Sequence, residues 1–158
     1  MSIAVKKKIT KTPQYWLNSI NRISTSFNMA SRDIGAILNI LTKKLKEELG
    51  VFAVAIWTVE EKTNFMKIEA SAGISAGYLR YFNQTDRIRA GKGLVGKVMS
   101  GRKTLHTLNP KNEKLIDITR WRQAMLDEGF VATISAPMFV GKKTVGAFSV
   151  YYKDHIPL

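Results

Sequence analysis

The glycine-rich run between Gly91 and Gly101 constrains the fold of this 158-residue chain more than any other segment. It reads G-x-G-x-x-G, which in dinucleotide-binding proteins lets a strand turn into a long helix beside a pyrophosphate. Here only about two helical turns separate Leu94 from Gly101, and glycine readily takes the left-handed conformation that ends a helix. The run therefore predicts a short helix capped at Gly101 and a strand over 103–107, and it disfavours a dinucleotide-binding fold.

Two amphipathic helices are predicted in the first third of the chain. Thr12 and Pro13 form a helix start, because the hydroxyl can cap and proline has no N–H to leave unpaired. A second start follows at Ser31, and Gly50 supplies the stop. Apolar residues recur at helical spacing in two stripes, Trp16, Ile20, Ile23 and Phe27 in the first helix, and Ile34, Leu38, Leu41, Leu45 and Leu49 in the second.

Beyond Gly50 the hydrophobic period changes to that of strands. Residues 51–59 form a nearly continuous apolar run, which is typical of a central strand covered on both faces. Residues 66–72 alternate between apolar and polar types, as in a strand with one buried face. The polar cluster between these two segments predicts a hairpin over 51–71.

A second hairpin is predicted near the end of the chain. Its strands are residues 131–140 and 144–152, and Gly141 lies at the turn, where glycine can supply a positive φ. Pro137 has no N–H to donate, so it predicts a bulge or an unpaired edge within the first of these strands. Residues 120–128 predict a helix before the hairpin.

The absence of cysteine narrows the possible chemistry, because it excludes disulfides, thiolate metal sites and cysteine nucleophiles. The two histidines, His106 and His155, are not at metal-ligand spacing, so no metal site is predicted. No serine–histidine–acid arrangement can be argued from them. The pairs Glu60-Glu61 and Asp127-Glu128 are neighbours in sequence, so their side chains point apart. The sequence therefore predicts no catalytic residue and no enzyme activity.

The formal net charge of +13 favours contact with polyanions. The excess is spread along the chain, with nine basic against three acidic residues in 1–50, seven against four in 51–100, and nine against five in 101–158. Only the lysines of residues 1–12 cluster, and this segment is predicted to be a flexible basic tail. Nucleic-acid binding is therefore kept as an alternative function and is not the favoured one.

Three glycine-led segments carry a family resemblance. They read GKGLVGKV from Gly91, with Gly101 after it, GFVATISAPM from Gly129, and GKKTVGAFSV from Gly141. In this order and spacing, over about residues 14–155, the chain resembles a GAF domain, a sensory and regulatory module of signalling proteins. The resemblance implies one α+β domain over 13–158. In it a central antiparallel sheet carries the N-terminal helices on one face, and connecting segments and short helices cover the other.

The resemblance does not identify a ligand, because this fold serves receptors, photoreceptors, reductases and dimerisation modules. Bilin attachment and sulfoxide reductase chemistry rest on cysteine in this family, so neither is expected here. The asparagine-lysine-phenylalanine-aspartate-glutamate signature of cyclic-nucleotide-binding members is also missing. The segment Asn109-Pro110-Lys111-Asn112-Glu113 does not reproduce it.

If the resemblance holds, a ligand would lie between the sheet and its cover. The candidate residues for this pocket are Trp57, Phe82, Leu94, Val98, Trp121, Met125, Thr133, Ser135 and Phe148. Basic residues near the short helix are candidates to meet an anionic ligand, and they are Arg87, Arg89, Lys92, Lys97, Arg120 and Arg122. The N-terminus of that helix would add unpaired N–H groups.

The favoured function is a non-enzymatic sensory domain in the cytoplasm that binds an unidentified small molecule. A ligand-free dimerisation scaffold is a further alternative, since the stripe that begins at Trp16 suits a homodimer through the first helix. Family members usually continue past the last strand into an output domain, and one is expected here. No secretory signal and no membrane partner are predicted, because the longest apolar run is far shorter than a membrane span.

Overall fold

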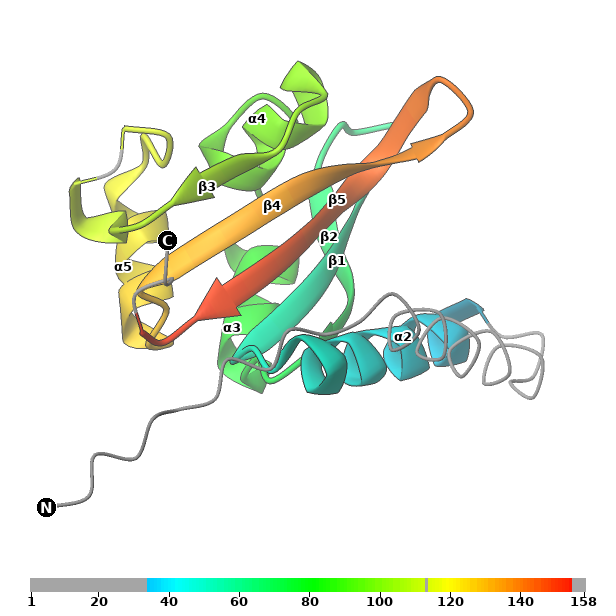
Figure 1. The fold of residues 1–158 in the computed structure, drawn as a ribbon. Coiled ribbons are helices and arrows are strands. Elements are labelled where there is room, and N and C mark those ends of the chain that lie inside the picture. The colour runs from blue at the N-terminus through cyan, green and yellow to red at the C-terminus, as the bar shows by residue number, and fades with distance from the viewer. Residues whose placement is uncertain (1–33, 113, 155–158) are drawn as a thin grey trace, which may run out of the picture.

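The computed structural model describes residues 34–112 and 114–154, which form one five-stranded sheet with helices on both faces (Figure 1). The strand order is β2-β1-β5-β4-β3, and every neighbouring pair is antiparallel. The strands are β1 (Ala53–Val59), β2 (Met66–Ala72), β3 (Leu105–Thr107), β4 (Ala132–Val140) and β5 (Lys143–Tyr152). The predicted α+β class with a central antiparallel sheet is confirmed.

The two strands at the centre, β1 and β5, are covered on both faces. In β1, the side chains of Ala53, Ala55 and Trp57 belong to the main core cluster, while Val54 and Ile56 are buried on the opposite face. A run of apolar residues that is buried on both sides is expected for such a strand. This is why residues 51–59 show no alternation.

Helix α2 (Ile34–Leu49) packs against β1 and β2 on one face of the sheet (Figure 1). It ends where predicted, before Gly50, whose N–H donates to the carbonyl of Lys46. The predicted leucine stripe is only half-buried at its centre, and its end residues Ile34 and Leu49 are exposed. The one fully buried side chain of α2 is that of Thr42, whose hydroxyl donates to the carbonyl of Asn39 in the same helix.

The other face carries the connecting segments. They contain α3 (Ala76–Arg80), the π-helical turn η1 (Tyr81–Thr85), α4 (Gly93–Gly101), a single 3₁₀ turn η2 (Pro110–Asn112) and α5 (Thr119–Asp127). The helices predicted over the glycine run and over 120–128 are both present. Since α4 contacts β3, β4 and β5, the short helix lies over the half of the sheet that ends at the β3 edge.

Pro137 is accommodated in β4 because β3 is short. Only Thr133 to Ser135 pair with β3, so no strand of the described part of the chain lies along the edge beside Pro137, and a register shift follows between Met138 and Phe139. Both features that the proline predicts are therefore present. The strand expected over 103–107 is shorter than predicted and begins at Leu105.

The end of α4 corrects the prediction for Gly101. The helix includes Gly101, and the left-handed residue is Arg102, with φ 56°. Its N–H donates to the carbonyl of Val98, and its guanidinium carbon lies 5.3 Å from the centroid of the Phe139 ring. Contact with the β4–β5 hairpin thus helps to hold a conformation that arginine alone disfavours.

Three predictions lie outside the described residues. They are the basic tail over 1–12, the first helix with its stripe from Trp16 to Phe27, and the link to an output domain beyond the last strand. None of the helices within 34–112 and 114–154 has the length and apolar character that a membrane crossing requires.

Candidate functional site

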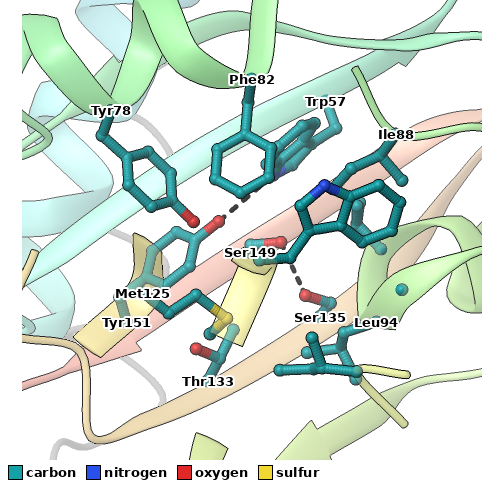
Figure 2. A pocket seen from close by; sticks show the side chains of 14 residues that line it. Trp57, Tyr78, Phe82, Ile88, Leu94, Met125, Thr133, Ser135, Ser149 and Tyr151 are labelled. Carbon is teal, nitrogen blue, oxygen red and sulfur yellow. Dashed lines mark hydrogen bonds between the residues drawn. The ribbon is translucent and has the colours of Figure 1, made fainter. Parts of the chain in front are cut away.

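A small cavity lies between the sheet and its cover of helices (Figure 2). Its floor comes from β1, β4 and β5, and its cover comes from α3, η1, α4 and α5. The cavity volume is about 30 Å³, enough for roughly two water molecules. The lining residues are Trp57, Tyr78, Phe82, Ile88, Gly93, Leu94, Val95, Ile116, Trp121, Met125, Thr133, Ser135, Ser149 and Tyr151.

Hydroxyl groups line the floor. The side chains of Ser135 and Ser149 are directly opposite each other on β4 and β5, and their oxygens lie 2.6 Å apart (Figure 2). Thr133 is 1% exposed, and its Oγ1 has no hydrogen-bond partner in the part of the chain that the structure describes. An unpaired buried hydroxyl is costly, so it suggests a site for another polar group.

Two tyrosines and a tryptophan close one end of the cavity. The indole Nε1 of Trp57 donates to the hydroxyl of Tyr151 over 3.3 Å, and the ring of Tyr78 lies beside them (Figure 2). Burial raises the pKa of Tyr151 to about 12 and also raises the pKa of Tyr78 well above its ordinary value. Both phenols therefore stay neutral across the physiological range of pH.

Asp86, which directly follows η1, attaches this part of the cover to α5. Its carboxylate accepts hydrogen bonds from Arg120, from the Tyr81 hydroxyl at 2.9 Å and from Trp121 Nε1 at 2.9 Å. Since Trp121 lines the cavity, this carboxylate orients one of its walls. The hydrogen bonds from Arg120 are the main reason that the pKa of Asp86 is lowered.

A second attachment joins the start of α3 to the end of α5. The Glu128 carboxylate accepts from the Ser75 N–H at 2.6 Å and from the Ser75 hydroxyl at 2.7 Å. The same hydroxyl accepts from the N–H of Tyr78 and so caps α3. Both attachments thus join elements of the cover to one another.

The glycine run shapes the start of α4. Gly93 has φ +59°, and a Cβ there would lie 3.0 Å from the ring of Trp121. The N–H of Gly93 donates to Asp117 Oδ1 over 3.4 Å, and Lys97 Nζ lies 3.8 Å from the same oxygen. The positive end of α4 therefore faces a carboxylate that belongs to the chain itself.

Replacing Asp117 with alanine is expected to lower the free energy of unfolding by about 0.5–1 kcal/mol, because the N-terminus of α4 loses its negative neighbour. Urea unfolding measures the change. Lys92→Ala is the matched control, since Lys92 precedes the helix and its side chain makes no capping bond. The control is expected to leave the stability equal or slightly higher. Equal losses in the two variants would contradict this role for Asp117.

Seven of the nine predicted pocket residues line the cavity, and they are Trp57, Phe82, Leu94, Trp121, Met125, Thr133 and Ser135. Val98 is fully buried in the surrounding core but does not line the cavity. The prediction that Phe148 lines the pocket is wrong. In β5 it alternates with Ala147 and Ser149, so it lies on the opposite face of the sheet, opposite Ile56. Whether any of them binds a ligand stays a prediction.

Several lining residues have no counterpart in the sequence-based prediction. The polar ones are Tyr78, Ser149 and Tyr151. A signal for Tyr78 was available, because Ser75 is a good N-cap three residues before it and Phe82 follows at helical spacing. No such signal separates the faces of β5, because both are buried.

The six basic candidates for an anionic ligand do not line the cavity. Arg87 pairs with Glu60, and Arg120 pairs with Asp86. Lys97 donates to the carbonyl of Leu115 over 2.8 Å. The remaining three are Arg89 over the ring of Phe65, exposed Lys92, and Arg122 bonded to Thr119. The nucleic-acid alternative, which concerns the outer surface, stays a prediction.

The arrangement can enclose a small molecule and hold it by hydrogen bonds. Among the described residues that line the cavity, neither Ser135 nor Ser149 has a histidine or a carboxylate beside it. Within the described residues, no group of three histidine, aspartate or glutamate side chains is placed to hold a metal ion.

Comparison with known proteins places this geometry in a family. The family model described as a GAF domain matches residues 31–156. Among solved structures, the chain is similar to the GAF domain of a phosphoenolpyruvate-protein phosphotransferase from Coxiella burnetii, with 15% identity and a TM-score of 0.71, over 89% of this chain and 80% of that one. A search of curated protein sequences finds no match.

Two further structures show the range of the fold. The nlh2 GAF domain of A. aeolicus, solved in an inactive state, is 25% identical, with a TM-score of 0.62 over 89% of this chain and 80% of that one. The free methionine-R-sulfoxide reductase of Neisseria meningitidis, solved with its substrate, is 18% identical, with a TM-score of 0.68 over 90% and 75%. The family match covers most of the sequence and the fold agrees with it, so this chain belongs to the GAF domain family.

Proposed function

We propose that this chain is a non-enzymatic regulatory domain that binds a small molecule in the cavity and passes the occupancy of that cavity to an attached output domain. GAF domains are commonly sensory modules of signalling proteins. The observation that carries the proposal is the buried, unpaired hydroxyl of Thr133 on the floor of a cavity inside the core. A stable core usually pairs such a group, so its persistence fits a ligand site.

The small volume suggests how occupancy changes the domain. A cavity of about 30 Å³ is far smaller than the several hundred Å³ of typical ligand pockets. A larger ligand would require the cover of α4 and α5 to move away from the sheet. A ligand that binds the open arrangement better shifts the population toward it. The proposal also includes a homodimer that forms through the first helix. That dimer would respond to the change in the population of the open arrangement.

Native mass spectrometry of the purified chain tests the proposal directly. A compound retained on the folded domain and released on unfolding is expected, and it can then be identified. Ile116→Phe is the matched variant, because Ile116 is 2% exposed and lines the cavity, so an added ring would fill it. This variant is expected to fold and to retain no compound. Ile134→Phe, on the opposite face of β4, is expected to retain the compound.

Two outcomes would contradict ligand sensing. One is the absence of any retained compound together with no change of melting temperature across a broad screen of metabolites and cyclic nucleotides. In that case, light scattering over a concentration series, with and without residues 1–30, would test the alternative of a dimerisation scaffold. The other is equal retention by wild type and Ile116→Phe, which would place the compound elsewhere.

A further inference from the structure

We infer that the cavity takes a small uncharged molecule with an amide or hydroxyl group, and that it rejects anions in spite of the protein's strong positive charge. This inference rests on the proposed function and narrows it to a class of ligand. It also reverses the prediction of an anionic ligand that the net charge and the basic residues near α4 favoured.

Among the residues that the structure describes, the lining contains no charged side chain. All 14 residues around the cavity are apolar, aromatic, glycine, serine or threonine. An ion transferred from water into such surroundings loses its hydration and gains no opposite charge in return. Most of the lining residues belong to the buried core cluster, so charges on the outer surface lie behind these side chains and replace little of that hydration.

Charged groups on the cover are already paired, Lys97 with Asp117 and Arg120 with Asp86. The start of α4, the obvious place for an anion, faces Asp117, whose carboxylate accepts from the N–H of Gly93. Arg120 beside the cover is bound to Asp86. An anion at either place would meet a carboxylate of the chain, and this repulsion opposes its binding.

The groups that do face the cavity suit a neutral polar ligand. The Thr133 hydroxyl can donate one hydrogen bond and accept others, and it has no partner among the described residues. The paired hydroxyls of Ser135 and Ser149 lie on the same floor, with the hydroxyl of Tyr151 along the same strand (Figure 2). An amide, which both donates and accepts, can complete the bonding of such a set.

Matched pairs of probes with the same shape and different charge test the inference. Acetamide and acetate form one pair, and urea and nitrate form another. Binding is followed by NMR through the indole N–H signals of Trp57 and Trp121, which both line the cavity. Because such small ligands bind weakly, titration to about 100 mM is needed. The neutral members are expected to bind at least tenfold more tightly than the anions.

Variants of Thr133 locate the polar contact. Thr133→Val is expected to weaken acetamide binding by about tenfold. It is also expected to raise the melting temperature by a few degrees, since an unpaired buried hydroxyl is removed. Thr133→Ser keeps the hydroxyl and should bind as wild type does. Thr42→Val is the matched control, because Thr42 is equally buried but lies on α2, across the sheet.

The outcomes distinguish a failure of the inference about the ligand class from a failure of the proposed function. If acetate or nitrate binds as tightly as its neutral partner, the inference is wrong and the proposed function stands. The same holds if the compound retained on the purified chain is an anion. Acetamide binding unchanged by Thr133→Val would overturn the assignment of the contact. If no probe binds and no compound is retained on the purified chain, both the inference and the proposed function are wrong.

Discussion

Gly96→Ala is expected to lower the free energy of unfolding by about 3 kcal/mol and the melting temperature by roughly 6–12 °C. A Cβ at Gly96 would lie 2.4 Å from the carbonyl oxygen of Arg89 and 3.1 Å from the N of Gly91. Both atoms belong to the backbone, which cannot turn aside as a flexible side chain can. The start of α4 would have to move away from the loop before it, and with it one wall of the cavity.

The matched control lies in the same helix. At Gly101 a Cβ would meet only the side chain of Lys103, at 3.9 Å. Gly101→Ala is therefore expected to leave the stability unchanged or to raise it by up to about 1 kcal/mol, because alanine is the better helix former. Thermal and urea unfolding of both variants measure the difference. Wild-type stability in Gly96→Ala would show that the backbone does not approach this closely.

The second large effect is expected at Asp86. Asp86→Ala should lower the free energy of unfolding by about 2–3 kcal/mol, because it leaves the buried N–H of Trp121 without an acceptor. It also frees Arg120 and the Tyr81 hydroxyl. Asp127→Ala is the control, because Asp127 lies on α5, the helix that carries Arg120 and Trp121. Asp127 is exposed and accepts only from Gln123 one turn earlier, so a change below about 0.5 kcal/mol is expected.

The same carboxylate predicts a pH dependence. The hydrogen bonds from Arg120 hold the pKa of Asp86 below its ordinary value. A carboxyl whose pKa is lower in the folded state stabilises the fold above its unfolded pKa of about 4, and this stabilisation is lost as the pH falls through the folded value. Wild type should therefore lose stability more steeply than Asp86→Asn below about pH 4.

Unfolding measured in urea from pH 7 to pH 3 checks this difference. The pKa of Glu60 is also lowered, by Thr63 and Arg87, but that contribution is present in both proteins and cancels. Parallel stability curves for the two proteins would contradict the role of Asp86. If Asp86→Asn is less stable at pH 7 but loses stability below pH 4 as steeply as wild type, the Asp86 side chain stabilises the fold through packing and not through its charge.

Sequence signals gave correct predictions for structural features that depend on one short segment of the chain. The change of period after Gly50 gave the end of α2 and the start of β1, and the glycine run gave the position of α4. Pro137 gave both a free edge and a bulge nearby. These features depend on backbone preferences of neighbouring residues, so they are readable from the sequence.

The site could be predicted only in part, for a different reason. Aromatic and apolar residues such as Trp57 and Trp121 are correctly placed because a cavity inside a core must be lined by core residues. Phe148 is on the wrong face because β5 is buried on both sides, and a single step along a strand reverses the side chain. Hydrophobicity cannot choose between two buried faces. Ser149 and Tyr151 were missed for that reason.

The sequence by itself determined the family, the antiparallel sheet, the short helix after the glycine run and the absence of cysteine chemistry. Only the tertiary structure decided which face of β5 lines the cavity, that Arg120 is bound to Asp86, and that the start of α4 faces Asp117. Each of these pairings joins segments far apart in the chain. Net charge is a sum over all residues, whereas binding depends on the few groups that packing leaves unpaired at one place. At this cavity the unpaired group is the neutral hydroxyl of Thr133.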